Sequence, residues 1–236
     1  MSEAPNAFGP YRPEAGRVRL SRDGEPLAPP ERQAAILLLL VVKAGTIVAK
    51  EALLEASGSH FLLGLVRLAR GDEAAAVQEF EQELALDDAA HIDTREACAY
   101  TWCAVGAVRL RQGDRAAASA AFERALVSVP DYALALAGRA FTTGTGPSQE
   151  SEGITLAARL EHLRGQGASV ETATVEAVRE ALAGRHASAA ALVQTAFEAA
   201  PAGNSCWILP VEPLLQVAAH PDEWAPVRAL VCSRAA

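Results

Sequence analysis

The sequence predicts a mainly α-helical chain of repeated helical hairpins, an α-solenoid, preceded by a small α+β element. Three observations predict this fold. Val66–Leu84 and Val108–Leu126 are identical at 11 of 19 positions, alanine dominates from about residue 70 onward, and prolines crowd the N-terminal stretch up to Pro30. Alanine favours helix interiors, whereas proline ends helices or stands outside them. We therefore expect two domains, residues 1–57 and residues 58–236.

Composition and charge exclude several classes of protein. The 236 residues carry a net charge of −8, which opposes the attraction to phosphate that a wholly basic nucleic-acid binder needs. The longest apolar run, Ala34 to Val42, is far shorter than the roughly 20 residues of a membrane span. The start of the chain, Met1 to Pro10, does not resemble a secretory signal. We expect a cytoplasmic protein whose four cysteines are thiols.

The N-terminal domain reads as a small antiparallel sheet followed by two helices. Short extended pieces at Phe8–Arg12, Arg17–Leu20 and Glu25–Leu27 are separated by turn residues. Glu31–Lys43 is an apolar helix that ends before Gly45, and Lys50–Ala56 is a second, short helix. Basic and acidic side chains balance, seven to seven, up to Ser57, so the acidic residues of the rest carry the net charge.

This element resembles the first half of an OmpR-type winged-helix DNA-binding domain. The segments that carry the resemblance are Phe8-Gly9-Pro10-Tyr11, Arg22 to Leu27, Leu37 to Leu40, and Lys50 to Leu54. In that family a recognition helix and a β-hairpin wing follow, whereas here Ser57 to His60 leads directly into the repeats. Specific readout of DNA needs that helix. We therefore expect a truncated winged-helix-like cap; a DNA tether through Arg17, Arg19, Lys43 and Lys50 is the alternative.

The repeated segments predict that the second domain is built of helical hairpins. Val66–Leu84 aligns with Val108–Leu126, and in both copies Gly-Asp separates two segments of helical periodicity. The glycine supplies a left-handed residue that ends the first helix, and the aspartate can accept hydrogen bonds from the first amides of the second. Small residues, Gly64 and Gly106 among them, allow two helices to approach closely, and Phe80 and Phe122 fill the gap toward the next hairpin.

The second copy resembles the tetratricopeptide repeat (TPR). The residues that carry the resemblance are Trp102, Gly106, Gly113, Ala118, Phe122, Ala125 and Pro130. The first copy departs from the pattern at His60, Glu83 and Asp88, and the spacing between the two copies exceeds the usual repeat length. The register places Trp102 between helices, which gives it a structural role.

Further hairpins complete the array. Gly184, Ala189, Ala196 and Pro201 follow one another at the same intervals as Gly113, Ala118, Ala125 and Pro130. Ala133–Phe141 and Ile154–Arg164 form an irregular hairpin around the polar loop 142–153. Cys206–Ala236 resembles the end segment of bacterial winged-helix proteins that carry these repeats, and we expect it to cap the last apolar face.

No motif of catalysis, cofactor binding or metal binding emerges. The acidic run Asp87–Asp93 with His91 is the best metal-like cluster, but an acidic linker is more often solvated. Cys98 and Cys103 lack the spacing of a zinc or redox pair. Thr142–Ser148 lacks the ending of a phosphate loop. We expect no enzyme, no cofactor and no metal.

The sequence therefore favours a scaffold that binds a protein or peptide partner, with a winged-helix transcriptional regulator as the alternative. The resemblance implies that the first helix of each hairpin lines a groove, which comprises Phe61, Leu65, Leu68, Tyr100, Cys103, Ala107, Arg111, Leu134, Ala137 and Phe141. The alternative is that the N-terminal element covers these apolar residues. Relatives that clamp a terminal carboxylate use Lys and Asn where this chain has Phe61, Leu65, Cys103 and Ala107. We expect an apolar or amphipathic partner segment, with no membrane as partner.

Overall fold

The structure is a computed structural model that describes residues 11–13, 20–22, 25–27, 36, 39–40, 43, 46–56, 59–85, 92–144, 155–201 and 209–235. The chain is mainly helical, as the sequence predicts. It divides into two compact units, Met1–Leu63 and Gly64–Ala236, which we call the N-terminal unit and the helical unit. The division lies within helix α3 (His60–Ala69), shortly after the boundary that the sequence predicts.

The N-terminal unit contains three short strands and one described helix. Strands β1 (Tyr11–Pro13), β2 (Leu20–Arg22) and β3 (Glu25–Leu27) pair antiparallel in that order. Helix α2 (Lys50–Ala56) has the predicted bounds. Most of the helix predicted at Glu31–Lys43 lies outside the described residues. The winged-helix resemblance therefore stays a prediction.

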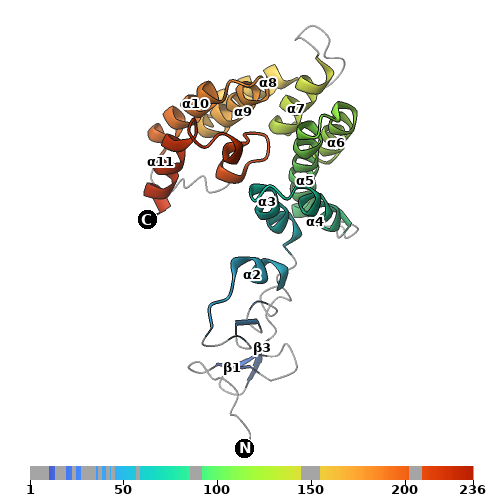
Figure 1. Cartoon of the computed structure of the whole chain (residues 1–236), viewed down its shortest axis with the longest axis vertical. Helices are drawn as coiled ribbons and strands as arrows, with labels where there is room; N and C mark the ends of the chain where they lie inside the picture. The colour runs from blue at the N-terminus through green and yellow to red at the C-terminus, as the bar shows by residue number, and fades with distance from the viewer. Residues whose placement is uncertain are drawn as a thin grey trace, which may run out of the picture. The chain divides into compact units, whose positions relative to one another are not determined.

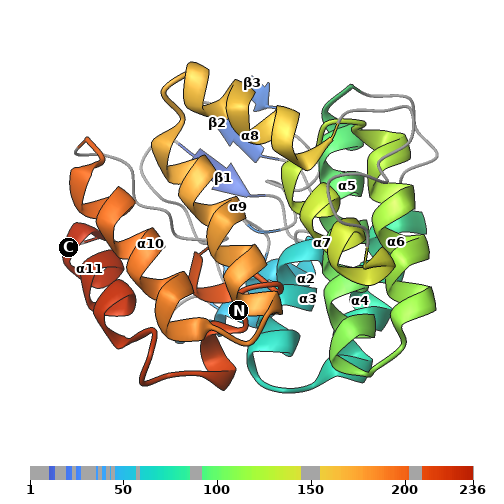
Figure 2. The ribbon, with the colours of Figure 1, turned by 90° about the horizontal axis from the view of Figure 1, so that it is seen from above.

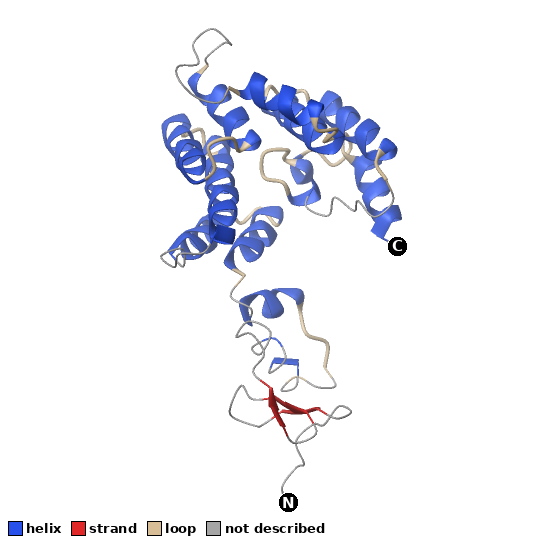
Figure 3. Cartoon of the chain, turned by 180° about the vertical axis from the view of Figure 1, so that it is seen from behind, coloured by secondary structure: helices blue, strands red, loops and turns tan. Residues whose placement is uncertain are grey.

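The helical unit is a succession of antiparallel helices that form an arch (Figures 1 and 3). Neighbouring helices along the chain pack against one another, so each buries its apolar stripe on the next. Its elements after α3 are α4 (Glu73–Ala85), α5 (Ile92–Arg111), α6 (Arg115–Ser128), α7 (Ala133–Thr143), α8 (Leu156–Gly165), α9 (Ser169–Leu182), α10 (His186–Ala199), the 3-10 helices η2 (Leu209–Val211) and η3 (Val217–Ala219), and α11 (Ala225–Ala235).

The Gly-Asp turns of the two clear repeats form as predicted. Gly71 and Gly113 have φ of +83° and +78°, a conformation that glycine adopts without a steric penalty. Asp72 and Asp114 each accept a hydrogen bond from the amide three residues on, at 3.1 Å and 2.9 Å. Each carboxylate thereby satisfies an amide that the first turn of the next helix leaves free.

Phe122 holds three helices together, and this confirms its predicted place between hairpins. Its ring is fully buried on α6. A β-carbon added at Gly106 of α5 would lie 2.6 Å from the ring, and one at Gly138 of α7 would lie 2.5 Å from it. Glycine at these two positions is therefore required by close packing of the ring.

The third repeat keeps the turn but loses the aspartate. Gly184 has φ of +77° between α9 and α10, where Arg185 replaces the capping residue. The Arg185 side chain instead pairs with Glu180 at 2.6 Å. The predicted correspondence of Gly184 with Gly113 thus marks a true helical hairpin.

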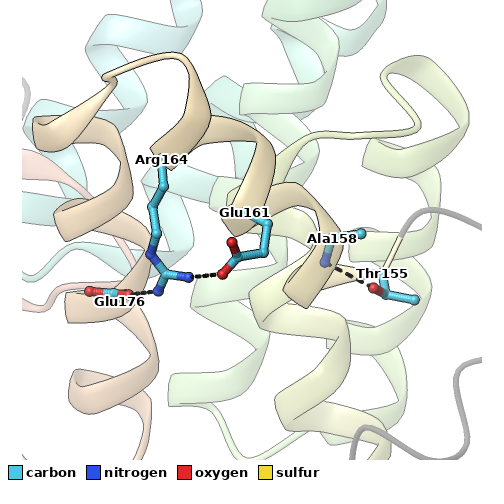
Figure 4. Close-up of polar contacts among 5 residues, drawn as sticks. All are labelled: Thr155, Ala158, Glu161, Arg164 and Glu176. Carbon is cyan, nitrogen blue, oxygen red and sulfur yellow. Dashed lines mark hydrogen bonds and ion pairs between the residues drawn. The ribbon is translucent and has the colours of Figure 1, made fainter.

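Helix α8 is joined to α9 by polar contacts (Figure 4). Thr155 Oγ1 accepts a hydrogen bond from Ala158 N and so caps the start of α8. The Arg164 guanidinium lies between Glu161 of α8, at 2.6 Å, and Glu176 of α9. These contacts fix the irregular helix of the array against its neighbour.

The chain from Leu209 to Ala219, which we call the inner segment, folds back into the inner side of the arch (Figures 1 and 2). Its apolar side chains join one core with residues of α5, α7 and α9. The buried leucine and valine residues of the inner segment are Leu209, Leu214, Leu215 and Val217. Helix α11 packs on α10, where Arg234 lies 4.5 Å from the ring of Phe197. No described helix combines the length and the apolar character needed to cross a membrane.

Candidate functional site

Most of the apolar residues predicted to line a groove are buried in the structure. Leu65 and Leu68 of α3 and Leu134 of α7 are buried, with exposed fractions of 2, 5 and 8%. Cys103, Ala107 and Ala137 are also buried. The apolar residues predicted to line an open groove therefore contribute largely to the packed core of the helical unit.

A cavity of about 590 Å³ remains open beside the inner segment, and we call it the inner cavity. It is bounded by α5, α7, α8, α9, the turn before α7 and the inner segment. Tyr100 and Leu134 are the two predicted groove residues that it brings together. Its lining comprises Glu96, Tyr100, Val129, Asp131, Tyr132, Ala133, Leu134, Arg159, Leu163, Val170, Glu171, Thr174, Val175, Leu209 and Glu212.

Two tyrosine rings form one wall of the inner cavity. Tyr100 of α5 and Tyr132, the residue before α7, have ring centroids 5.1 Å apart and planes tilted by 58°. Burial raises the pKa of Tyr100 above 10.0 and that of Tyr132 well above 10.0. Both phenols therefore remain uncharged at neutral pH, and Tyr100 is 37% exposed.

Glu212 supplies a buried carboxyl group to the same cavity. Its Oε1 accepts a hydrogen bond from Leu214 N at 3.3 Å within the inner segment. The residue is 7% exposed, and burial raises the pKa of its carboxyl to about 7. Glu212 thus changes charge near neutral pH, which an exposed glutamate does not do.

We expect Glu212 to make folding stability depend on pH. Its carboxyl holds a proton more tightly in the folded chain than in the unfolded one, so stability falls as pH rises from about 4.5 to about 7. A shift of this size corresponds to roughly 3 kcal/mol. Glu212→Gln should therefore be more stable than wild type at pH 8 by up to this amount and similar to it at pH 4.5. Urea unfolding of both proteins at the two pH values measures the difference.

Acidic side chains outnumber basic ones around the inner cavity. Arg159 Nη1 forms an ion pair with Asp131 Oδ2 at 3.0 Å, which neutralises one carboxylate. Glu96 of α5 and Glu171 of α9 are exposed, and Glu212 lies deeper. The field inside the cavity therefore favours a cation over an anion.

Two other predicted groove residues lie in a second recess of about 470 Å³. Arg111 Nε pairs with Glu73 Oε1 at 2.8 Å, and Phe141 lies under the guanidinium of Arg115 at 4.8 Å. Gln216 of the inner segment also lines this recess. Phe61 belongs to the N-terminal unit. The residues predicted to line the groove thus fall in two recesses, in the core of the helical unit and, for Phe61, in the N-terminal unit.

The described residues contain no group of three or more His, Cys, Asp or Glu placed to hold a metal ion. The acidic run at 87–93 lies outside the described residues, apart from the backbone at the start of α5. Cys98 and Cys103 are buried thiols, and burial raises the pKa of Cys103 well above 9.0. A reactive thiolate at Cys103 is therefore disfavoured at neutral pH.

Sequence reasoning missed Glu212, Tyr132 and Arg159 as lining residues. The sequence Pro210-Val-Glu-Pro213 has no periodicity that predicts burial, although a glutamate between two prolines and two leucines could have drawn attention to it.

No family model, curated protein or solved structure matches this chain.

Proposed function

We propose that the helical unit is a TPR-type protein-interaction module that binds a segment of a partner protein at the inner cavity. The observation that carries the proposal is the inner cavity itself. It is large enough for side chains, and it is bounded by apolar residues such as Leu134 and Val175 beside polar groups, as binding sites commonly are.

The inner segment supports the same proposal. It is a largely irregular stretch of this chain that buries three leucines and a valine on the inner side of the arch. The helices that pack against this irregular apolar segment have the shape and polarity to bind a similar segment of a partner protein beside it. The residues that line the inner cavity all belong to the helical unit, so the proposal does not involve the truncated winged-helix-like element, residues 1–57.

A screen of displayed random peptides against the full chain tests this function. Thr174 lines the cavity and Thr195 lies exposed on α10, and each hydroxyl donates to the carbonyl four residues earlier. Thr174→Arg and Thr195→Arg are therefore a matched pair. We expect enriched peptides to lose binding to Thr174→Arg at least tenfold and to keep it with Thr195→Arg.

Equal binding to both variants, or no enrichment above background, would refute the module. Tyr100→Ala removes a partly exposed ring and provides a second cavity variant if Thr174→Arg does not fold. The regulator alternative makes a different prediction. It requires micromolar binding to mixed-sequence duplex DNA at about 50 mM salt that disappears at about 200 mM, whereas the interaction module should show none.

A further inference from the structure

Among the described residues, the carboxyl group of Glu212 lacks a positively charged partner and a hydrogen-bond donor to Oε2. Oε1 accepts one hydrogen bond, from Leu214 N, and no described residue donates a hydrogen bond to Oε2. No lysine, arginine or histidine of the described chain forms an ion pair with it. Burial of an ionised carboxylate without a positive partner is costly, and a cation that enters the cavity would remove that cost.

The nearby arginine does not fill this role. Arg159 is the positively charged side chain among the described residues that line the cavity, and its guanidinium is committed to Asp131 at 3.0 Å. Glu96 and Glu171 add two further negative charges to the lining. An incoming carboxylate or phosphate would meet repulsion from three glutamates.

The tyrosine pair adds a second kind of attraction for a cation. Tilted rings at 5.1 Å form a corner, so one group can contact an aromatic face and a ring edge together. Aromatic faces attract ammonium and guanidinium groups, most strongly where water is displaced. Arginine also stacks on such rings through its planar guanidinium.

We infer that the inner cavity binds the guanidinium or ammonium group of an arginine or lysine side chain of the partner segment, between the Glu212 carboxylate and the rings of Tyr100 and Tyr132. The inference rests on the proposed function and names the chemistry that this function recognises. The stem of such a side chain would lie along the apolar wall, which includes Leu134 and Val175.

Calorimetric titration of the full chain with N-acetyl-arginine amide tests the inference. N-acetyl-citrulline amide has the same shape without the charge and is the matched ligand. We expect the arginine compound to bind at least tenfold more tightly. Glu212→Gln should abolish this preference, whereas Glu123→Gln, at an exposed position of α6, should retain it.

The affinity for the arginine compound should rise about tenfold between pH 6 and pH 8, because a carboxyl with a pKa of about 7 passes from about one tenth to about nine tenths ionised. Other titratable or charged groups around Glu212 are Glu96, Tyr100 and Cys103 of α5, Asp131 and Tyr132 before α7, Arg159 of α8 and Glu171 of α9. Glu212→Gln separates its titration from theirs, so this variant should lose the pH dependence.

Equal affinity for the two compounds, or an unchanged preference in Glu212→Gln, would overturn the inference. The peptide screen separates this failure from failure of the module. Peptides that lack basic residues but bind wild type and not Thr174→Arg would refute the cation site and leave the interaction module intact. Enriched peptides that share an arginine or lysine, and lose binding to Glu212→Gln, would support both.

Discussion

Replacing Trp224 by alanine is expected to lower the free energy of unfolding by about 3 to 5 kcal/mol, the usual cost of truncating a buried aromatic side chain. Trp224 is the largest fully buried side chain of the described chain. It lies between the inner segment and α11, and its backbone bonds to His220 and Arg228. Chemical denaturation monitored by circular dichroism measures the loss.

Trp102→Ala is the control for this prediction. The sequence suggests that Trp102 is the structural tryptophan, but it is half-buried, with the guanidinium of Arg124 4.6 Å from its ring. Its truncation leaves a shallower cavity and loses a cation–π contact of about 0.5 to 1 kcal/mol. We expect a distinctly smaller loss than for Trp224→Ala. Equal losses of unfolding free energy in the two variants would contradict the full burial of Trp224.

Gly138→Ala is expected to destabilise the helical unit by about 1 to 3 kcal/mol, the range for overpacking a tight core. A new β-carbon would lie 2.5 Å from the fully buried ring of Phe122, which also packs against Gly106 of α5. In an unconstrained helix the same change stabilises by about 1 kcal/mol. The sign of the effect therefore tests the packing.

Gly165→Ala is the matched control. A β-carbon at Gly165 would meet nothing within 4 Å, so this substitution should be neutral or slightly stabilising. Phe122→Leu should partly rescue Gly138→Ala, because a smaller side chain vacates the contact. Additive losses in the double variant, measured by urea unfolding, would show that Phe122 does not pack on Gly138.

The repeat architecture could be predicted because its signals are local and periodic. The spacing of Gly113, Asp114 and Phe122 reports how one hairpin turns and closes, and these contacts form as expected. Propensity and capping act over a few residues, so they can be read from one sequence. Of the residues predicted to line a groove, Tyr100 and Leu134 line the inner cavity.

The candidate site could be predicted only in part. Glu212 and Leu209 reach the inner cavity because a proline-rich segment without periodicity folds back over helices α5 and α7, which come much earlier in the chain. That placement depends on shape complementarity in the assembled arch, which no local pattern encodes. Burial then changes the pKa of Glu212, an effect that composition alone does not indicate.

Fluorine NMR of 3-fluorotyrosine-labelled protein tests most directly the claim that the inner cavity is the binding site. The chain has three tyrosines, of which Tyr100 and Tyr132 line the cavity and Tyr11 lies in β1 of the N-terminal unit. On titration with N-acetyl-arginine amide, we expect the Tyr100 and Tyr132 signals to shift and the Tyr11 signal to remain unchanged. A shift of Tyr11 alone, or no shift at saturating concentration, would contradict the assignment of this cavity.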